Sequence, residues 1–298
     1  MRVLHIDTGR RMGGGQHQVL HLLRGLTSRG VAVRLLARGE LLRIASREGF
    51  DAGAATLLSV GVDAGSFDLV HAHDAKSHTW AALVAPSKLI VARRVVFPVR
   101  TGWASRWKYG RPRRFIAISH SVRRELVRAG VDGAKIDIVP DGVPIPERVM
   151  PYEERPADHI LGIVKDSVGD FRALERLGVQ APRELADDIP TARALVYLSQ
   201  SEGLGSAALL AMAHGVPVIA SRTGGLIEAI EDGVSGILVE NPQGVEAALR
   251  RLRDDPSWAA KLGGAGRDRA ARLFSVDQMV DGTLQVYRKV VKEGRTKT

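Results

Sequence analysis

The sequence contains no cysteine, so the protein has neither disulfides nor thiolate metal ligands. Long apolar runs are also missing, and no stretch has the length needed to cross a bilayer. The first residues, Met1–Asp7, have the pattern of a buried strand instead of the apolar region of a signal peptide. We therefore expect a protein of the reducing cytoplasm that is not secreted.

The composition is that of a two-domain α/β protein. The chain has 298 residues, 45% of them hydrophobic, and 32 glycines, which is enough for two hydrophobic cores. Short apolar runs alternate with glycine turns and amphipathic stretches, the order expected for parallel sheets covered by helices. A proline-rich, polar stretch at 144–156 separates two such series and predicts a linker. The expected domains are 1–143 and 157–275, followed by a C-terminal helix within 276–298.

Positive charge is concentrated in segment 93–128, where eleven Arg and Lys residues stand against one acid, Glu125. The whole chain carries +10, so the rest of it has no net charge. Trp103, Trp107 and Tyr109 lie among these cations. Aromatic rings beside cations suit a membrane surface or a phosphorylated glycolipid; the alternative is a solvated basic face with tryptophans in the core. Nucleic acid is not an expected partner, because no recognised nucleic-acid motif accompanies the segment.

The most informative motif is a strand, turn, helix, strand and turn in the second half of the chain. Apolar Ala194–Leu198 predicts a buried strand, Glu202–Gly205 a glycine-bracketed turn, and Ser206 the start of a small-residue helix that ends at His214. Val216–Ala220 predicts the next strand, before a second glycine turn. In parallel sheets, ligands bind at the carboxyl ends of the strands, where helix N-termini present amide groups to phosphate. Both turns belong to that edge.

This motif resembles the donor-site signature of the retaining, GT-B-fold glycosyltransferases of family four, the group 1 type. Four segments fall in the family's register: Glu-Gly-Leu-Gly at 202–205, Ala-Met-Ala at 211–213, Gly-Val-Pro-Val at 215–218 and Gly-Gly-Leu-Ile-Glu at 224–228. Leu210 stands where the family has a second Glu, which holds the ribose of the nucleotide. The resemblance implies two Rossmann-like domains facing a cleft, with the C-terminal helix crossing back to the first domain.

The resemblance extends to the first domain and implies a set of site residues. Gly13–Gln16 resembles the family's Gly-Gly-x-Glu loop, with Gln16 in place of Glu, and His71–Asp74 resembles its His-x-His segment. Glu202 and His73 are the implied catalytic residues. The implied donor site consists of Gly13, Gly14, Gly15, Gly203, Leu204, Gly205, Ser206, Thr223, Gly224 and Gly225. An acceptor site or anionic surface is expected at Arg94, Arg100, Trp103, Arg106, Trp107, Lys108 and Arg111.

The co-substrate implied by the resemblance is a UDP- or GDP-linked sugar, and no other cofactor is expected. Backbone amides at a helix N-terminus can bind phosphate without a metal ion. No Asp is followed by another Asp two positions later, so the Asp-x-Asp metal signature of the other glycosyltransferase fold is absent from the sequence. We therefore expect metal-independent transfer.

The histidines and Glu202 each leave alternatives open. His71, His73, Asp74 and His78 could together form a metal site. In the other interpretation, His71 is buried and hydrogen-bonded while His73 alone faces the cleft. The alternative for Glu202 is an ordinary turn glutamate.

Three features of the family are missing. The first is the Glu at position 210. The second is the Arg and Lys pair that neutralises the donor diphosphate, because Lys165–Asp170 does not match that motif. The third is a His after the fifth strand, where this chain has Phe97–Arg100. The second domain also lacks a leading strand and helix. We expect it to have fewer strands than the first, with four clear ones at Ile160–Val164, Ala194–Leu198, Pro217–Ala220 and Gly236–Val239.

Two functional hypotheses follow. The first is a retaining glycosyltransferase that moves a sugar from a nucleotide-sugar to a cell-envelope glycolipid or polysaccharide, as in lipopolysaccharide biosynthesis, at the inner face of the membrane. In this case cations of segment 93–128 replace the missing Arg and Lys. The second is a catalytically inactive relative that binds a partner or an anionic surface through the same segment. The sequence does not indicate an oligomeric state.

Overall fold

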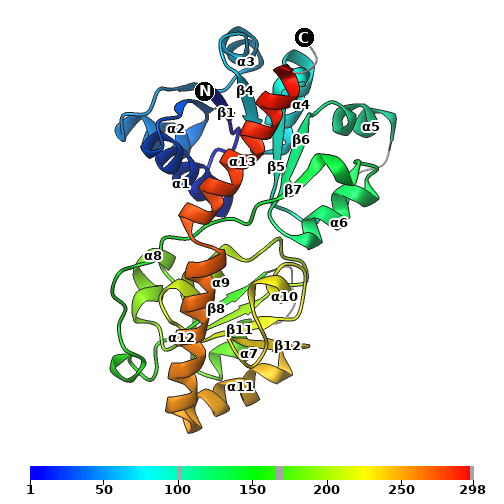
Figure 1. Ribbon diagram of the computed structural model, residues 1–298. Coiled ribbons are helices and arrows are strands. Elements are labelled where there is room, and N and C mark those ends of the chain that lie inside the picture. Colours follow the sequence, from blue (N-terminus) through cyan, green and yellow to red (C-terminus); the bar gives the residue numbers. More distant parts are fainter. Residues whose placement is uncertain (100–101, 166–170, 296–298) are drawn as a thin grey trace. The chain divides into compact units, whose positions relative to one another are not determined.

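A computed structural model describes residues 1–99, 102–165 and 171–295 (Figure 1). The chain forms two compact units: unit 1 contains Met1–Pro140 and Val276–Thr298, and unit 2 contains Asp141–Ser275. Each unit is built on one parallel sheet and its helices. The α/β class expected from the sequence is therefore confirmed.

Unit 1 has a seven-stranded sheet in the order β3-β2-β1-β4-β5-β6-β7, and its neighbouring strands are parallel. The strands are β1 (Arg2–Ile6), β2 (Ala32–Ala37), β3 (Ala52–Ala54), β4 (Leu69–Ala72), β5 (Leu89–Arg93), β6 (Arg114–Ala117) and β7 (Ile136–Ile138). Central strands such as β4 are buried along their whole length, as parallel strands covered on both faces are. The chain adds β2 on one side of β1 and β4 on the other, so the β1/β4 boundary is a topological switch point.

The helices of unit 1 follow the strands in alternation. They are α1 (Gly14–Ser28), α2 (Gly39–Arg47), α3 (Leu57–Ala64), α4 (Ala75–Val84), α5 (Trp103–Gly110), α6 (His120–Arg128) and α13 (Val276–Arg295), with short 3₁₀ turns η1 (Pro86–Lys88) and η2 (Gly133–Lys135). A capping box begins α4: the Asp74 carboxylate accepts hydrogen bonds from the backbone N–H groups of Lys76 and Ser77, and the Asp74 N–H donates to the Ser77 hydroxyl.

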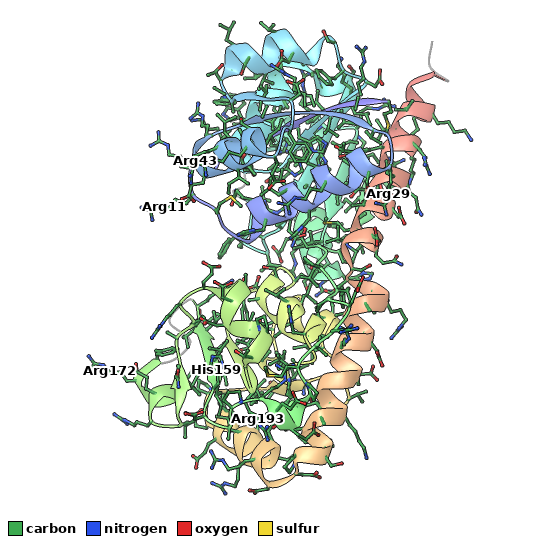
Figure 2. The ribbon with its side chains drawn as sticks, turned by 90° about the vertical axis from the view of Figure 1, so that its left-hand side faces the viewer. Arg11, Arg29, Arg43, His159, Arg172 and Arg193 are labelled. Atoms are coloured by element: carbon green, nitrogen blue, oxygen red, sulfur yellow. The ribbon has the colours of Figure 1, made fainter. Side chains whose placement is uncertain are left out.

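Helix α13, from the C-terminal end of the chain, belongs to the core of unit 1. Figure 1 shows it in red beside the strands of this unit, and its buried residues Val280, Leu284 and Tyr287 lie in one apolar cluster with residues of β1, α1, β5 and β6. Contact with α1 is close, because a Cβ atom at Gly25 would come within 2.4 Å of the Val280 side chain. At the end of α1, Arg29 pairs with Asp277 and Asp281 of α13 (Figure 2 labels Arg29).

Unit 2 has a smaller sheet of five parallel strands in the order β12-β11-β10-β8-β9. The strands are β8 (Ile160–Val164), β9 (Val179–Gln180), β10 (Ala194–Leu198), β11 (Val218–Ser221) and β12 (Ile237–Val239). The expectation that the second sheet has fewer strands is confirmed. The expected count of four was one too low, because β9 is only two residues long and leaves no periodic signal in the sequence. The switch point of this sheet lies between β8 and β10.

The helices of unit 2 are α7 (Phe171–Glu175), α8 (Leu185–Asp188), α9 (Ser206–Ala213), α10 (Leu226–Ala229), α11 (Gln243–Asp254) and α12 (Pro256–Leu273), with 3₁₀ turns η3 (Tyr152–Glu154) and η4 (Ile189–Thr191). The segment expected as a linker packs on this unit. Tyr152 lies in its core, and the buried Arg155 guanidinium donates to the backbone carbonyls of four residues, Met150, Pro190, Ala192 and His214. The Arg193 guanidinium stacks on the Tyr152 ring (Figure 2 labels Arg193).

Within residues 1–99, 102–165 and 171–295, no helix combines the length and the apolarity needed to cross a bilayer.

Candidate functional site

Glu202 and Lys165 lie at the switch point of the unit 2 sheet. Glu202 belongs to the loop that follows β10, and Lys165 directly follows the neighbouring strand β8. From these two strands the chain proceeds to opposite sides of the sheet. Ligands of open parallel sheets bind in the crevice outside the carboxyl ends at such a point.

Glycines let the two loops at this edge pack backbone against backbone. A Cβ atom at Gly225 would lie 1.9 Å from the Gly203 carbonyl oxygen, and one at Gly224 would lie 2.2 Å from that of Glu202. The Gly225 N–H donates to the Glu202 carbonyl at 2.8 Å. Gly205 adopts a left-handed conformation, with φ of 88°, directly before α9. The glycine pattern therefore fixes Glu202 at the start of α9.

Three donors hold the half-buried Glu202 carboxylate. Its Oε2 atom accepts hydrogen bonds from the Tyr197 hydroxyl at 2.5 Å and from Lys165 Nζ at 2.9 Å. Its Oε1 atom accepts from the Gly203 N–H at 3.0 Å. Glu202 is therefore a fixed carboxylate that is paired with a positive charge.

Lys165 is a site residue that sequence reasoning missed. Segment 165–170 was interpreted as the loss of the family's cationic motif, yet Lys165 brings a positive charge to Glu202. The position of Lys165 directly after a buried strand could have indicated its role, because the carboxyl ends of parallel strands meet at one edge of the sheet. Residues 166–170 of that segment lie outside the described residues.

The other expected donor-site residues of unit 2 lie around Glu202. Gly203, Leu204 and Gly205 are buried, and Ser206 is the first residue of α9, whose N-terminus has no side-chain cap and no acidic residue in its first turn. The Thr223 hydroxyl donates to the Gln200 carbonyl, which ties the second loop to the first. Leu210, in α9, is half-buried.

In unit 1 the glycine loop before α1 is joined to the end of β1 by Gln16 and Asp7. The Gln16 amide donates to both carboxylate oxygens of Asp7, at 3.1 and 3.2 Å, and the Gly9 N–H also donates to Asp7. Asp7 is buried, and this burial raises its pKa. A Glu at position 16 would place a second carboxylate against Asp7, so Gln is the residue that fits here. Gly13, Gly14 and Gly15 precede Gln16 on this loop and the first turn of α1.

Three histidines lie at the switch point of the unit 1 sheet: His5 on β1, His71 on β4 and His73 just after β4. A guanidinium can only donate, so Arg94, at 3.4 Å from His73 Nδ1, leaves the His73 proton on Nε2. This Nε2–H donates to His5 Nδ1 at 3.0 Å. The Tyr287 hydroxyl of α13 lies 2.6 Å from His71 Nδ1.

The three imidazoles are neutral at neutral pH. Burial lowers the pKa of His5 to about 3 and holds the pKa values of His71 and His73 well below 6.5. The expectation that His71 is buried and hydrogen-bonded is confirmed, and His73, expected to face the cleft, is buried as well. His5 was not anticipated: a lone His in an apolar strand gave no sign of its partners on β4.

The four-residue metal site considered from the sequence does not assemble. Asp74 is used by the α4 cap and by the Thr8 N–H and hydroxyl, and His78 contacts the Lys108 carbonyl. The set that could hold a metal ion is instead His5, His71 and His73, with one ring nitrogen each within 4.8 Å of one another. The Arg94 guanidinium beside His73 opposes a cation at this place.

Segment 93–128 divides into exposed and internal cations. On α5, Trp103 is 85% exposed and Trp107 is 40% exposed, so the alternative of core tryptophans was wrong. They lie four residues apart on one helix face with exposed Arg106, and Arg111 stacks over the Trp107 ring. Lys108 donates to the Ala75 carbonyl, Arg94 is the half-buried partner of His73, and Arg100 lies outside the described residues.

Part of segment 93–128 is an internal set of salt-bridged cations and not an exposed basic surface. Arg114 is 8% exposed and pairs with Asp137 and with Glu293 of α13. Arg113 also pairs with Glu293, and Arg128 pairs with Glu125. The acids at 137 and 293 lie beyond the segment in sequence, so a local charge count could not include them.

Two family models match this chain. The model "Glycosyltransferase Family 4" matches residues 12–147, and "Glycosyl transferases group 1" matches residues 164–255. The second range includes β10, the Glu202 loop and α9. The chain belongs to the group 1, family-four glycosyltransferases. Leu210, Gln16 and Lys165 are therefore features of this member within that family.

Relatives and solved structures agree with this assignment. A D-inositol 3-phosphate glycosyltransferase of Thermobifida fusca is 37% identical over 139 residues, which are 46% of this chain and 32% of that protein. The chain thus matches about a third of the length of this relative. The structure of Anabaena HepE with UDP and glucose has a TM-score of 0.80 at 17% identity, covering 96% of this chain and 99% of that one. A Rickettsia africae glycosyltransferase has a TM-score of 0.80 at 15% identity, covering 98% of each. The fold is that of the GT-B glycosyltransferases.

Proposed function

We propose that this protein transfers a sugar from a nucleotide-sugar to an acceptor hydroxyl, with retention of the anomeric configuration and without a metal ion. The observation that carries the proposal is the Glu202 carboxylate, fixed at the switch point of the unit 2 sheet, beside the N-terminus of α9 and next to Lys165. A helix N-terminus and a lysine attract a diphosphate, and a carboxylate accepts hydrogen bonds from sugar hydroxyls. The helix N-terminus, the lysine and the carboxylate lie together at one sheet edge, which supports the binding of a nucleotide-sugar there.

The donor in this proposal is UDP-linked. Support comes from the HepE structure, which was solved with UDP and glucose. The diphosphate is placed at the α9 N-terminus and Lys165, and the sugar at Glu202 Oε1. Lys165 takes over from the Arg and Lys of the family, which this chain lacks.

The acceptor in this proposal is an anionic cell-envelope glycolipid or polysaccharide, reached by a protein that binds the inner face of the membrane. Support comes from the exposed Trp103 and Trp107 of α5, which lie with Arg106 of the same helix and Arg111 just after it, a pairing suited to an interface of apolar chains and phosphate groups. The Thermobifida fusca relative is named for a phosphorylated acceptor, inositol 3-phosphate, which is also an anion.

The test of the donor is a thermal-shift screen with UDP- and GDP-linked sugars, followed by transfer assays. A ligand that binds only the folded protein raises its apparent stability by mass action. We expect a shift with UDP-sugars, transfer that persists in EDTA, and a product with the anomeric configuration of the donor. No shift with any nucleotide-sugar would contradict the proposal.

The test of the site is Glu202→Gln, which keeps the shape of the side chain and removes its charge. Transfer should fall by about tenfold to a thousandfold, because a charge-assisted contact of about 1.5–4 kcal/mol is weakened. The control is Glu246→Gln on α11, an exposed carboxylate paired with Arg250, which should leave transfer unchanged. Equal transfer by the wild type and Glu202→Gln would remove Glu202 from the mechanism.

The second candidate is an inactive relative that binds anionic surfaces through α5. Leu210 favours it, because the ribose-binding Glu of the family is missing. Sedimentation with vesicles tests it: binding to phosphatidylglycerol vesicles and not to phosphatidylcholine vesicles, together with no transfer from any donor, would favour this function. Equal binding to both vesicle types at low salt would exclude the anionic surface.

A further inference from the structure

Tyr197 carries a hydroxyl that packing alone does not require. It is the fourth residue of β10, in the run Ala-Leu-Val-Tyr-Leu, and it is 1% exposed and among the largest fully buried side chains. A phenylalanine would fill the same space. A buried phenol keeps its hydroxyl only at a cost unless the hydroxyl finds a partner, and this one donates to Glu202 Oε2.

The three donors on Glu202 differ in how firmly they are held. Tyr197 is fixed by the core of the sheet, and the Gly203 N–H is part of a loop that is packed backbone to backbone. Lys165 is 48% exposed and reaches Glu202 from the end of β8. A long, exposed lysine can turn to another anion, whereas a buried phenol cannot.

The hydrogen bonds of the Glu202 carboxylate also leave one of its acceptor positions unused within the described residues. A carboxylate has about four acceptor positions on its two oxygens. Oε2 uses two of them for Tyr197 and Lys165, and Oε1 uses one for Gly203. The remaining position is on Oε1, the oxygen that Tyr197 does not contact.

We infer that Tyr197 is a positioning residue for Glu202: it keeps Oε1 directed at the donor sugar when Lys165 leaves Oε2 for the diphosphate. The inference rests on the proposed function, and it assigns to one phenolic hydroxyl a role that neither the glycine loop nor Lys165 can supply. Without this hydroxyl, Glu202 would lose its only side-chain donor in the described structure that is fixed by the core.

The variant Tyr197→Phe tests the inference, because it removes the hydroxyl and keeps the ring. We expect kcat for transfer from UDP-glucose to fall by about tenfold, with the KM for the donor changed by less than about threefold. The matched control is Tyr152→Phe in the same unit, whose buried hydroxyl donates to the Leu252 carbonyl. This control should keep the wild-type kcat.

A double-mutant cycle separates positioning from a general effect on the fold. In the Glu202→Gln background, Tyr197→Phe should change kcat by less than about twofold, because the group through which it acts has already been altered. The same loss in both backgrounds would show that Tyr197 acts only on the structure and would overturn the inference. Thermal melts of all variants check that they are folded.

Calorimetry with UDP and UDP-glucose supplies a second readout. Tyr197→Phe should leave the Kd for UDP unchanged and raise the Kd for UDP-glucose by less than about threefold, whereas Lys165→Met should weaken the binding of both. If the wild type transfers sugar and Tyr197→Phe equals it in kcat and in both Kd values, the role of Tyr197 is refuted and the proposed function stands. If the wild type neither binds UDP-glucose nor transfers from any donor, the proposed function fails and this inference fails with it.

Discussion

At the switch point of the unit 1 sheet, the histidines and Asp7 are buried and hydrogen-bonded: His73 to His5 and to the half-buried Arg94, His71 to Tyr287, and Asp7 to the half-buried Gln16. At the same point of the unit 2 sheet, a half-buried carboxylate is paired with a half-exposed lysine. Both sheets place a glycine loop and a helix N-terminus there. The two sites differ in burial. Burial keeps the imidazoles of unit 1 neutral, whereas the charge pair of unit 2 is partly exposed and can bind a ligand.

The two sheet edges therefore have different roles. In unit 1, the network connects β1, β4 and α13 and fixes the loop before α1, so it supports the structure around a site. In unit 2, the loop is fixed by glycine packing, and the side chains remain available for binding. Changes at the two edges should therefore have different costs in stability and in binding.

The largest effect is expected for Gly225→Ala. The new methyl group would collide with the Gly203 carbonyl oxygen, because their separation would be 1.9 Å, and the free energy of unfolding should fall by about 3 kcal/mol or more. Binding of UDP-glucose should be lost at the same time. Urea unfolding and calorimetry measure the two effects.

Gly264→Ala is the control for this change. Gly264 is an exposed residue of α12 in the same unit, and an added Cβ atom meets nothing within 4 Å. Alanine should stabilise this helix by about 0.5–1 kcal/mol. Wild-type stability and binding in Gly225→Ala would show that the two loops do not depend on close packing.

The next largest change in stability is expected for an internal cation of unit 1, in contrast to an exposed one. Arg114→Met removes the buried partner of Glu293 and Asp137 and should lower the free energy of unfolding by about 2–3 kcal/mol. Arg106→Met should change it by less than about 0.5 kcal/mol and should weaken binding to phosphatidylglycerol vesicles instead. Denaturant unfolding and vesicle sedimentation would give the same result for the two variants if segment 93–128 were uniformly exposed.

Acid should destabilise unit 1 before unit 2. A histidine whose pKa is lowered on folding binds its proton only in the unfolded state, so its contribution to stability is complete above pH 6.5 and falls as the pH drops below that value. For His5, with a folded-state pKa of about 3, the loss between pH 6.5 and pH 5 is about 2 kcal/mol. His71 and His73 add to it, and the raised pKa of Asp7 acts in the opposite direction.

Hydrogen exchange resolved by peptide distinguishes the two units. Peptides from β1 and β4 should lose protection between pH 7.5 and pH 5, corrected for intrinsic exchange rates, more than peptides from β10 and β11. His214, in unit 2, also has a pKa lowered by burial, and it is only half-buried. Equal loss in both units would show that the imidazole network does not set the stability of unit 1.

The smallest effect is expected for Leu210→Glu, which restores the family residue. Because Leu210 is half-buried, the carboxylate can reach solvent, and stability should change by about 1 kcal/mol or less. UDP should bind more tightly by a few-fold if the new carboxylate accepts the ribose hydroxyls. Unchanged UDP affinity would mean that this chain holds the ribose in another way.

Local patterns in the sequence predicted the two parallel sheets, except for the two-residue strand β9, and the loop of Glu202. Apolar runs predicted β8 and β10, and the glycine spacing placed Glu202 before α9. The partners of those residues could not be predicted in the same way. Lys165 and Tyr197 reach Glu202 only once β8 and β10 are neighbours, and no rule of spacing pairs Arg114 with a glutamate 179 positions later.

The partners of the histidines and of Gln16 could not be predicted from the sequence for a similar reason. The His-x-His segment was recognised, but its burial depends on His5, which lies on another strand, and on Tyr287, which lies on α13. Gln16 was noted only as a departure from the family. Its role became clear with Asp7, nine residues earlier, whose carboxylate accepts both hydrogen bonds from the amide.

The place of α13 has a consequence for biosynthesis. Unit 2 is a continuous stretch of chain, whereas unit 1 is completed by residues that the ribosome adds after all of unit 2. Val280, Leu284 and Tyr287 fill a core whose other walls come from the first 140 residues. On the ribosome, unit 2 can finish first, while the apolar surface of unit 1 that α13 covers stays exposed until this last helix emerges.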